Sequence, residues 1–246
     1  MRKPTMILFD YGQTLANQKQ FDGIAGTKAV MKYATKNKYN HTAEDVMAAV
    51  DAINMEIADA KHHLVQIEVP NHMFTVYLYQ SLGIEISLTA QDIDRVFWNA
   101  ASPGVPSDGI EDFLVFLKEQ GIRTGVITNI TFCGDAVIDR INNLLPKHNF
   151  EFIIATSEYM FRKPNKRIFE LALEKADLQP EDVWYIGDNY LCDVVGARSA
   201  GIFPVWYIGA TADPQGADDV LTISHWDELQ RQIEELTNKE VEVNHD

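Results

Sequence analysis

Short apolar runs alternate with helical patterns from residue 102 onward. Four of the runs are of the buried-strand type, and they cover residues 123–128, 152–155, 183–186 and 203–207. Apolar residues at helical spacing predict helices over 110–120, 135–145, 165–176 and 190–200. Strands that alternate with helices in this way are typical of βαβ units on a parallel sheet. The run Met6–Phe9 predicts one more strand near the start of the chain.

Residues 22–101 show a helical pattern without a strong strand signal. Thr42 and Thr89 are each followed three positions later by an aspartate, a pairing that suits the N-terminus of a helix. An apolar stripe follows each of them, and a third stripe runs from Met73 to Leu82. The stripes need a partner surface to cover them, so this block is expected to form a helical unit of its own.

Together the two patterns predict an insertion in an α/β fold. We expect a Rossmann-like three-layer core with a parallel sheet, formed by residues 1–16 and 102–246, and an inserted all-α domain at residues 17–101. The length of 246 residues allows this division, because domains average about 150 residues.

Composition and charge exclude several classes of protein. The 21 basic and 36 acidic side chains give a net charge of −15, which disfavours nucleic acid or an anionic membrane as a partner. Hydrophobic residues make up 46% of the chain, too many for an acidic disordered protein. Cys133 and Cys192 are too few for a disulfide scaffold. With no signal-type segment and no apolar stretch near the ~20 residues of a membrane span, we expect a cytoplasmic protein.

Polar and ionisable side chains follow the predicted strands. Asp10 follows the first strand, Thr128-Asn129 ends the second, and Asp188 follows the strand at 183–186, with Asp193 five residues later. Ligands of open parallel sheets bind where the strands end. Three carboxylates at one edge repel one another unless a cation joins them, and an all-oxygen set suits Mg²⁺. The sequence therefore predicts a magnesium site.

Lys163 supports an acidic site indirectly. Pro164 is predicted to be the first residue of a helix, which places Lys163 at the positive end of the helix dipole, where a cation needs a compensating acid. An aspartate at a strand end, such as Asp10, could then act as a nucleophile on phosphorus while a metal ion neutralises the phosphoryl oxygens.

In this order, the four segments resemble the motifs of the haloacid dehalogenase superfamily of hydrolases, most of which are Mg²⁺-dependent phosphatases. The motifs correspond to Asp10–Thr14, Thr128-Asn129, Lys163-Pro164 and Gly187–Ala197. The resemblance covers essentially the whole chain. The helical insertion is similar to the α-helical cap of that family, which closes over the active site and selects the substrate.

For the reaction, the resemblance implies a covalent mechanism. Asp10 would be the nucleophile that forms an aspartyl-phosphate. Thr128 and the Asn129 amide would hold the phosphoryl oxygens. Lys163 would stabilise the negative charge of the nucleophile and of the transferring group.

For the metal, the resemblance implies a Mg²⁺ ion held by four residues. Asp10 and the carbonyl oxygen of Gly12 would be ligands. Asp188 would bind the ion directly, and Asp193 would bind it directly or through water.

Gly12 is the departure that matters, because the family's phosphatases carry an aspartate there as general acid and base. Such catalysis is typically worth about 10²–10⁴-fold. Two interpretations stay open: a loss of phosphatase chemistry, or its rescue by a cap residue or water. Gln13 also replaces the usual glycine, which predicts a displaced loop.

The leading hypothesis is a Mg²⁺-dependent hydrolase that acts on a small phosphorylated metabolite through Asp10. One alternative is a degenerate member that binds a phosphorylated ligand or partner with little turnover. Another is a phosphonate or haloacid hydrolase, since both tolerate a missing acid. We expect a monomer or homodimer.

One local charge excess lies within the predicted cap. Five lysines face only Asp22, which fits either a solvated helix face or attraction of an anionic substrate. They are Lys19, Lys28, Lys32, Lys36 and Lys38.

Overall fold

The apolar runs of the chain form one six-stranded parallel sheet in a computed structural model, which describes residues 2–18, 20–58, 66–210 and 219–243. The strand order is β10-β9-β8-β1-β6-β7, and every neighbouring pair is parallel. The strands are β1 (Met6–Phe9), β6 (Arg123–Thr128), β7 (Phe150–Ala155), β8 (Val183–Gly187), β9 (Phe203–Tyr207) and β10 (Leu221–Ile223). The predicted α/β fold is confirmed.

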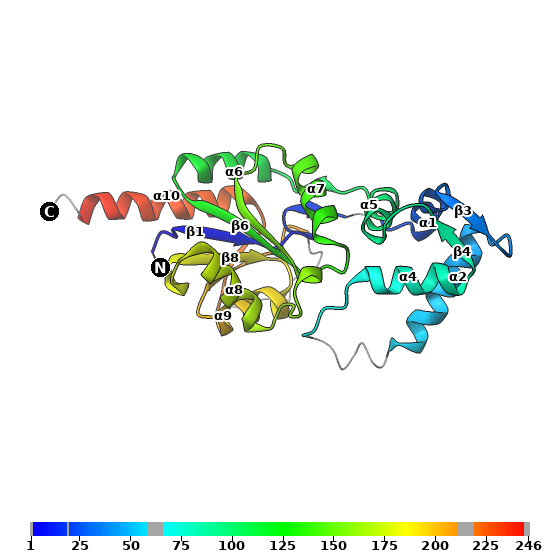
Figure 1. The fold of residues 1–246 in the computed structure, drawn as a ribbon. Helices are drawn as coiled ribbons and strands as arrows, with labels where there is room; N and C mark the ends of the chain where they lie inside the picture. Colours follow the sequence, from blue (N-terminus) through cyan, green and yellow to red (C-terminus); the bar gives the residue numbers. More distant parts are fainter. Residues whose placement is uncertain (1, 19, 59–65, 211–218, 244–246) are drawn as a thin grey trace.

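Helices cover both faces of the sheet, which explains why the central strand β1 is apolar and buried along its whole length. Side chains alternate between faces along a strand, so Ile7 and Phe9 of β1 join one buried cluster while Met6 and Leu8 join another. The first cluster lies under three helices: α6 (Ile110–Glu119), α7 (Gly134–Leu144) and α10 (Trp226–Val243). The second lies under two: α8 (Lys166–Ala176) and α9 (Gly196–Ser199). The core thus has three layers (Figure 1).

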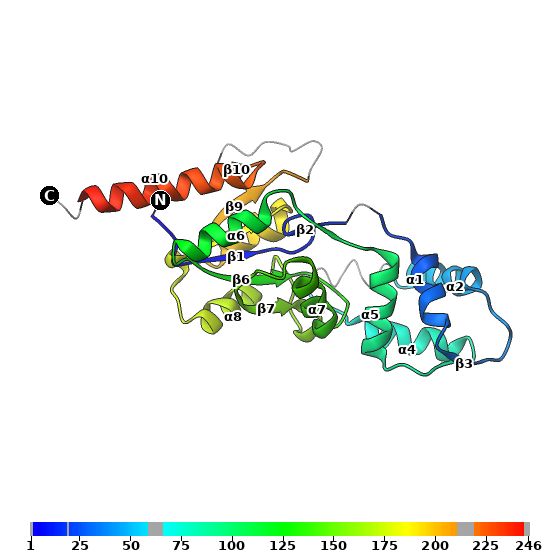
Figure 2. The ribbon, with the colours of Figure 1, turned by 90° about the horizontal axis from the view of Figure 1, so that it is seen from above.

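The predicted helical insertion lies beyond the edge at which the central strands end (Figures 1 and 2). Its helices are α1 (Gly23–Met31), α2 (Ala43–Glu56), α4 (Asn71–Ser81) and α5 (Ala90–Ala101), and they share an apolar cluster of their own. The insertion is not purely helical, because β3 (Ala34–Asn37) and β4 (Ile84–Ile86) form an antiparallel pair. The sequence did not predict these strands, which are short and carry exposed polar residues.

Two segments connect the core and the insertion, and they pair with each other. β2 (Ala16–Asn17) and β5 (Val105–Pro106) form a short antiparallel sheet where the chain leaves the core and returns to it. The exact division at residues 16/17 and 101/102 stays a prediction. None of the helices within the described residues is both long and apolar enough to cross a membrane.

The predicted helix starts at Thr42 and Thr89 are confirmed, since each side chain accepts a hydrogen bond from the N–H three residues later. The predicted start at Pro164 is wrong. Asn165 caps α8 by accepting from the Arg167 N–H, so the helix begins at Lys166 and Pro164 lies outside it.

The predicted helix over residues 190–200 is two elements. A π-helical segment, Tyr190–Val195, precedes the short helix α9. Its wider turn was not predictable from apolar spacing. The sequence also did not predict β10 and α10 at the end of the chain.

Candidate active site

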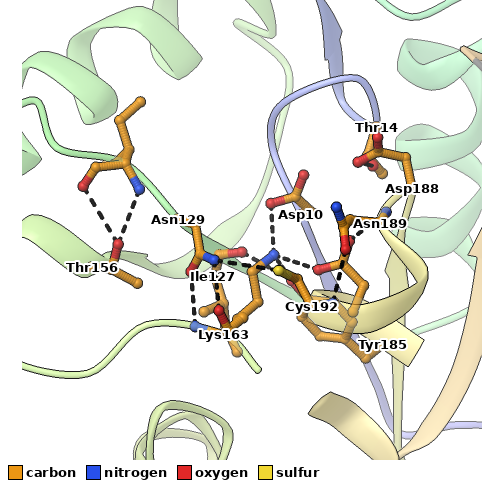
Figure 3. A network of polar contacts seen from close by, with 12 residues as sticks. Asp10, Thr14, Ile127, Asn129, Thr156, Lys163, Tyr185, Asp188, Asn189 and Cys192 are labelled. Carbon is orange, nitrogen blue, oxygen red and sulfur yellow. Dashed lines mark hydrogen bonds and ion pairs between the residues drawn. The ribbon is translucent and has the colours of Figure 1, made fainter. Parts of the chain in front are cut away.

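The predicted site residues meet where the central strands end. Asp10 directly follows β1, Thr128 ends β6, and Asp188 directly follows β8. These three strands are neighbours in the sheet, with β1 in the middle. Figure 3 shows Asp10, Lys163 and Asp188 converging from separate elements. The sheet topology therefore brings together residues that are far apart in the sequence.

The Lys163 ammonium group is at the centre of the site and is fully buried. Its Nζ donates to Asp10 Oδ1 at 2.7 Å, to Asp193 Oδ1 at 2.6 Å and to the Tyr185 hydroxyl at 2.6 Å. The Lys163 side chain is 1% exposed. All three ammonium hydrogens thus have partners. The sequence predicted one compensating acid for Lys163, and the structure has two, Asp10 and Asp193.

Tyr185 is the site residue that sequence reasoning missed. Its hydroxyl accepts from Lys163 and donates to the Ile127 carbonyl at 3.0 Å, which ties the lysine to strand β6. Burial, together with the neighbouring Asp193 and Asp10 charges, raises the pKa of Tyr185 well above its ordinary value. In the sequence this tyrosine is one more apolar-type residue of a buried strand, so no local signal marked it.

Asp193 is fixed by both of its carboxylate oxygens. Oδ1 accepts from Lys163, and Oδ2 accepts from the Asn189 N–H at 2.9 Å. The π-helical segment that carries Asp193 packs it against Gly187, where an added Cβ would lie only 2.3 Å from the carboxylate. A glycine before Asp188 is thus required for this arrangement.

The electrostatics show an excess of negative charge. Burial raises the pKa of Asp10 from 3.8 to about 7; Lys163 opposes this rise, and the Asp193 and Asp188 charges add to it. Burial raises the pKa of Asp188 to about 6, and the Asp193 charge contributes again. Burial lowers the pKa of Lys163, but Asp10 and Asp193 outweigh it, so that this pKa is raised. One ammonium group does not balance three carboxylates.

The residues present fit a divalent cation. One oxygen each of Asp10, Asp188 and Asp193 lies within 4.8 Å of the others. An all-oxygen set that is short of positive charge suits Mg²⁺, which commonly binds one or two carboxylates together with waters and substrate phosphate. The Thr14 hydroxyl lies 3.5 Å from Asp188 Oδ1 and helps to orient it.

Asn129 holds the backbone of Lys163. Its Oδ1 accepts from the Lys163 N–H at 2.8 Å, and its Nδ2 donates to the Lys163 carbonyl at 2.9 Å. The side chain is therefore engaged in fixing the lysine loop. Thr128 lies buried at the end of β6, beside this contact. That either residue binds a phosphoryl group stays a prediction.

Around Gly12 there is open space, because a Cβ built on it would meet no atom within 4 Å. Gln13 adopts a left-handed backbone conformation with φ of 57°, and its N–H donates to the Ala16 carbonyl at 2.8 Å. Glycine takes this conformation without the Cβ penalty, which accounts for the glycine usual at that motif position. Displacement of the loop stays a prediction.

The family follows from the match over this whole arrangement. The model of the haloacid dehalogenase-like hydrolase family matches residues 7–207, from β1 through the insertion to β9. The chain belongs to the haloacid dehalogenase-like hydrolases.

Curated relatives of this haloacid dehalogenase-like hydrolase align over part of its length. It is 33% identical over 114 residues to the human haloacid dehalogenase-like hydrolase domain-containing protein 3, covering 46% of this chain and 44% of that protein. It is 37% identical over 90 residues to a glyceraldehyde 3-phosphate phosphatase of Methanothermobacter thermautotrophicus, covering 36% and 38%. The chain spans less than half the length of these relatives.

Among solved structures, a 2-haloacid dehalogenase from Pseudomonas syringae pv. Tomato DC3000 shares the fold of this haloacid dehalogenase-like hydrolase. The TM-score is 0.64 at 19% identity, with 94% of this chain and 97% of the other covered. At this identity the likeness concerns the fold alone.

Proposed function

We propose that the chain is a Mg²⁺-dependent phosphohydrolase that transfers a phosphoryl group from a small phosphorylated metabolite to Asp10 and then hydrolyses it. One observation carries the proposal: Lys163 is buried between Asp10 and Asp193, with Asp188 beside them. A structural ion pair would need a single acid. A lysine surrounded by an excess of carboxylates supports a site that receives a cation and an anionic substrate.

In the proposed reaction a carboxylate oxygen of Asp10 attacks phosphorus and the bond from phosphorus to the ester oxygen breaks. The ester oxygen leaves with the bonding electrons and takes a proton from water to give the free alcohol. Lys163 orients Asp10 through the 2.7 Å hydrogen bond and offsets negative charge near the transferring group. Water then attacks the phosphoryl group, releases inorganic phosphate and restores the Asp10 carboxylate. Thr128 and the main-chain N–H of Asn129 are the proposed donors to the phosphoryl oxygens.

Asp10, the Gly12 carbonyl and Asp188 would hold the Mg²⁺ ion. Asp193 has both oxygens engaged, which supports a role through water or through Lys163. When bound, the ion supplies positive charge that lets the carboxylates and the phosphoryl oxygens approach one another.

Two observations favour phosphate esters as the proposed substrate class: the acidic cluster around Lys163, and the name of one relative. The glyceraldehyde 3-phosphate phosphatase that aligns with part of this chain is named for a small phosphate ester. The acidic cluster with its single lysine supports the same class, since the proposed ion adds the positive charge that a phosphate group needs.

The test is Asp10→Asn. The variant keeps the size of the side chain and removes the nucleophile, so hydrolysis of p-nitrophenyl phosphate with Mg²⁺ is expected to fall below detection. Asp51→Asn, at an exposed position on α2, is the matched control and is expected to keep full activity. Unchanged turnover in Asp10→Asn would end the proposal.

A second candidate function is binding of a phosphorylated ligand with little turnover, and Gly12 favours it. Glycine cannot protonate a leaving group, and no side chain of the described residues fills the space beside it. The two functions differ on an alkyl phosphate, whose leaving group needs a proton. Robust wild-type hydrolysis of ethyl phosphate with Mg²⁺ would exclude the second candidate, whereas tight binding without hydrolysis would support it.

A further inference from the structure

The cap contains a cavity of about 540 Å³, which is within the usual size range of ligand pockets. Residues of four cap helices, α1, α2, α4 and α5, line it, and core residues line it on one side. Well-packed helical units leave few voids larger than a water molecule, so a space of this size is a candidate ligand-binding pocket. Val50, Phe74, Leu78 and Phe97 line it from the cap.

The core side of the cavity is formed by the loops that carry the candidate active site. Phe132 and Arg162 line this side, together with Thr131. Arg162 directly precedes Lys163, so their Cα atoms are about 3.8 Å apart. Thr131 is two residues after Asn129, a span of at most about 7 Å. The lining thus includes close chain neighbours of Lys163 and Asn129, while Asp10, Asn129 and Lys163 themselves lie outside it.

Hydrogen bonds fasten the cap to these loops. The Asn71 N–H donates to the Thr131 carbonyl at 2.8 Å, and the Arg162 N–H donates to the Gln66 carbonyl at 3.1 Å. The Glu68 N–H donates to the Met160 carbonyl at 3.1 Å. These hydrogen bonds therefore fix the loop after β6 and the loop before Lys163 relative to the cap residues that line the cavity.

Several polar side chains of the lining are already paired within the protein. The Glu68 carboxylate accepts from Thr156 at 2.5 Å and from Arg162 at 3.2 Å, and its side chain is 1% exposed. Asn71 donates to the Thr75 hydroxyl at 3.0 Å. Burial raises the pKa of Tyr79 to about 12, so its hydroxyl stays uncharged. Among the residues that the structure describes, the lining thus suits an apolar group better than a sugar or a charged one.

We propose that this cavity receives the leaving group of the substrate, and that the substrate is a phosphate ester of an apolar alcohol with a hydrocarbon chain or ring system. This assignment rests on the proposed function. It narrows the substrate class from phosphorylated metabolites in general to those whose alcohol part is apolar. The phosphate lies at Asp10 and the hydrocarbon part extends past Phe132 into the cap.

Octyl phosphate and ethyl phosphate test the assignment, because their ester bonds are equally reactive and differ only in what the cavity could hold. With Mg²⁺, kcat/KM of the wild type is expected to be at least tenfold higher for octyl phosphate. Val50→Trp fills the cavity and is expected to remove this preference by lowering kcat/KM for octyl phosphate at least tenfold. Ala52→Trp adds the same bulk to an exposed position of the same helix and is expected to change neither value.

Binding of Prodan, a neutral naphthalene dye, gives a second measurement that needs no turnover. The wild type and Ala52→Trp are expected to bind the dye, and Val50→Trp to bind it at least tenfold more weakly. If Val50→Trp does not fold, Val69→Trp takes its place at a lining position that is 42% exposed.

The outcomes separate the two proposals. Equal kcat/KM for the two esters, or equal behaviour of Val50→Trp and Ala52→Trp, would overturn the leaving-group assignment and leave the proposed function standing. Dye binding that is lost only in Val50→Trp, with no hydrolysis of either ester, would overturn the proposed function and support an apolar ligand in the cavity.

Discussion

Gly12 is the residue at which the proposed reaction is expected to gain most from a substitution. In the proposed reaction nothing at this position donates a proton to the leaving group. The open space around it and its ordinary backbone conformation mean that a larger side chain fits without rearrangement. Gly12→Asp is therefore expected to raise kcat for ethyl phosphate by about 10²–10⁴-fold, the usual contribution of general acid–base catalysis.

Gly12→Asn is the matched control for that prediction, since it adds the same volume without an ionisable proton. It is expected to leave kcat near the wild-type value. The gain in Gly12→Asp is also expected to be small for p-nitrophenyl phosphate, whose leaving group departs without a proton. An equal gain in both variants would show that the effect comes from packing.

Asp10 and Asp188 make stability depend on pH and metal. Their pKa values in the folded protein, about 7 and about 6, lie above the ordinary value of 3.8, so the folded state holds more protons than the unfolded state between these limits. Without metal, the free energy of unfolding contributed by these groups falls as pH rises from about 4 to about 7. The proposed Mg²⁺ ion would bind the ionised form, so its stabilising effect is expected to be larger at pH 8 than at pH 5.

Thermal unfolding with EDTA or with Mg²⁺ measures this effect. At a concentration about 100-fold above Kd, Mg²⁺ is expected to add about 2.7 kcal/mol to the free energy of unfolding at pH 8. Asp188→Asn removes one ligand and is expected to abolish the Mg²⁺-induced rise in Tm, while the metal-free variant is as stable as the wild type or more so. An equal rise at both pH values would contradict a site built from these carboxylates.

At the scale of single residues, the sequence predicted the ionisable groups better than their partners. Asp10, Lys163 and Asp193 were predicted because each occupies a motif position near a strand end. Tyr185 was not, because its role depends on a hydroxyl that reaches from β8 past β1 to the Ile127 carbonyl of β6 and to Lys163. Such contacts depend on sheet register, which no single segment specifies.

At the scale of elements, the N-terminus of helix α7 is held by two carboxylates that other elements supply. Each accepts a hydrogen bond from a main-chain N–H at the start of the helix. Asp94 of α5 accepts from the Cys133 N–H at 2.9 Å, and Glu158 accepts from the Gly134 N–H at 2.7 Å. These acids satisfy N–H groups that a helix start leaves unpaired, and their charge suits the positive end of the helix. The cap therefore helps to fix a helix of the core.

Asp94→Ala removes this link and leaves the Cys133 N–H without its acceptor. The free energy of unfolding is expected to fall by about 1–3 kcal/mol, the range for loss of a helix cap and of a hydrogen bond to a charged group. Urea denaturation measures it. Asp51→Ala, at an exposed position of α2, is expected to change it by less than about 0.5 kcal/mol. Equal losses in the two variants would contradict a link through Asp94.

Element boundaries followed from sequence where the signal is local. Thr42 and Thr89 start helices because their side chains reach the N–H three residues later. The start of α8 was mispredicted because Asn165 competes with Pro164 as the boundary residue. The strands β3 and β4 pair across more than 40 residues and lack an apolar run, so their pairing is visible only in the folded chain.

At the scale of the whole molecule, the order of patterns along the chain predicted an α/β core with a helical insertion, and the structure confirms it. The insertion's local charge excess is partly balanced by partners distant in sequence, since Lys28 and Lys36 form exposed ion pairs with Glu44 and Glu85. Such pairs contribute little to stability, and they favour the solvated-face interpretation over attraction of substrate.

The cavity in the cap could not be predicted, because it depends on how far apart the cap helices pack. Sequence periodicity places Val50 and Leu78 on apolar faces but does not say whether those faces touch. Their separation leaves room beside the loops that carry Lys163. The two proposals thus concern neighbouring parts of the molecule, the acidic edge of the sheet and an apolar space in the insertion.

The most direct test of the central claim is chemical trapping of the intermediate on Asp10. The protein is mixed with ³²P-labelled octyl phosphate and Mg²⁺, quenched in acid, digested and mapped by mass spectrometry. If Asp10 is the nucleophile, we expect a label on the peptide that contains Asp10, released by hydroxylamine as expected for an acyl phosphate, and absent from Asp10→Asn. Hydrolysis that proceeds in the wild type without any label on Asp10, or a label that persists in Asp10→Asn, would contradict it.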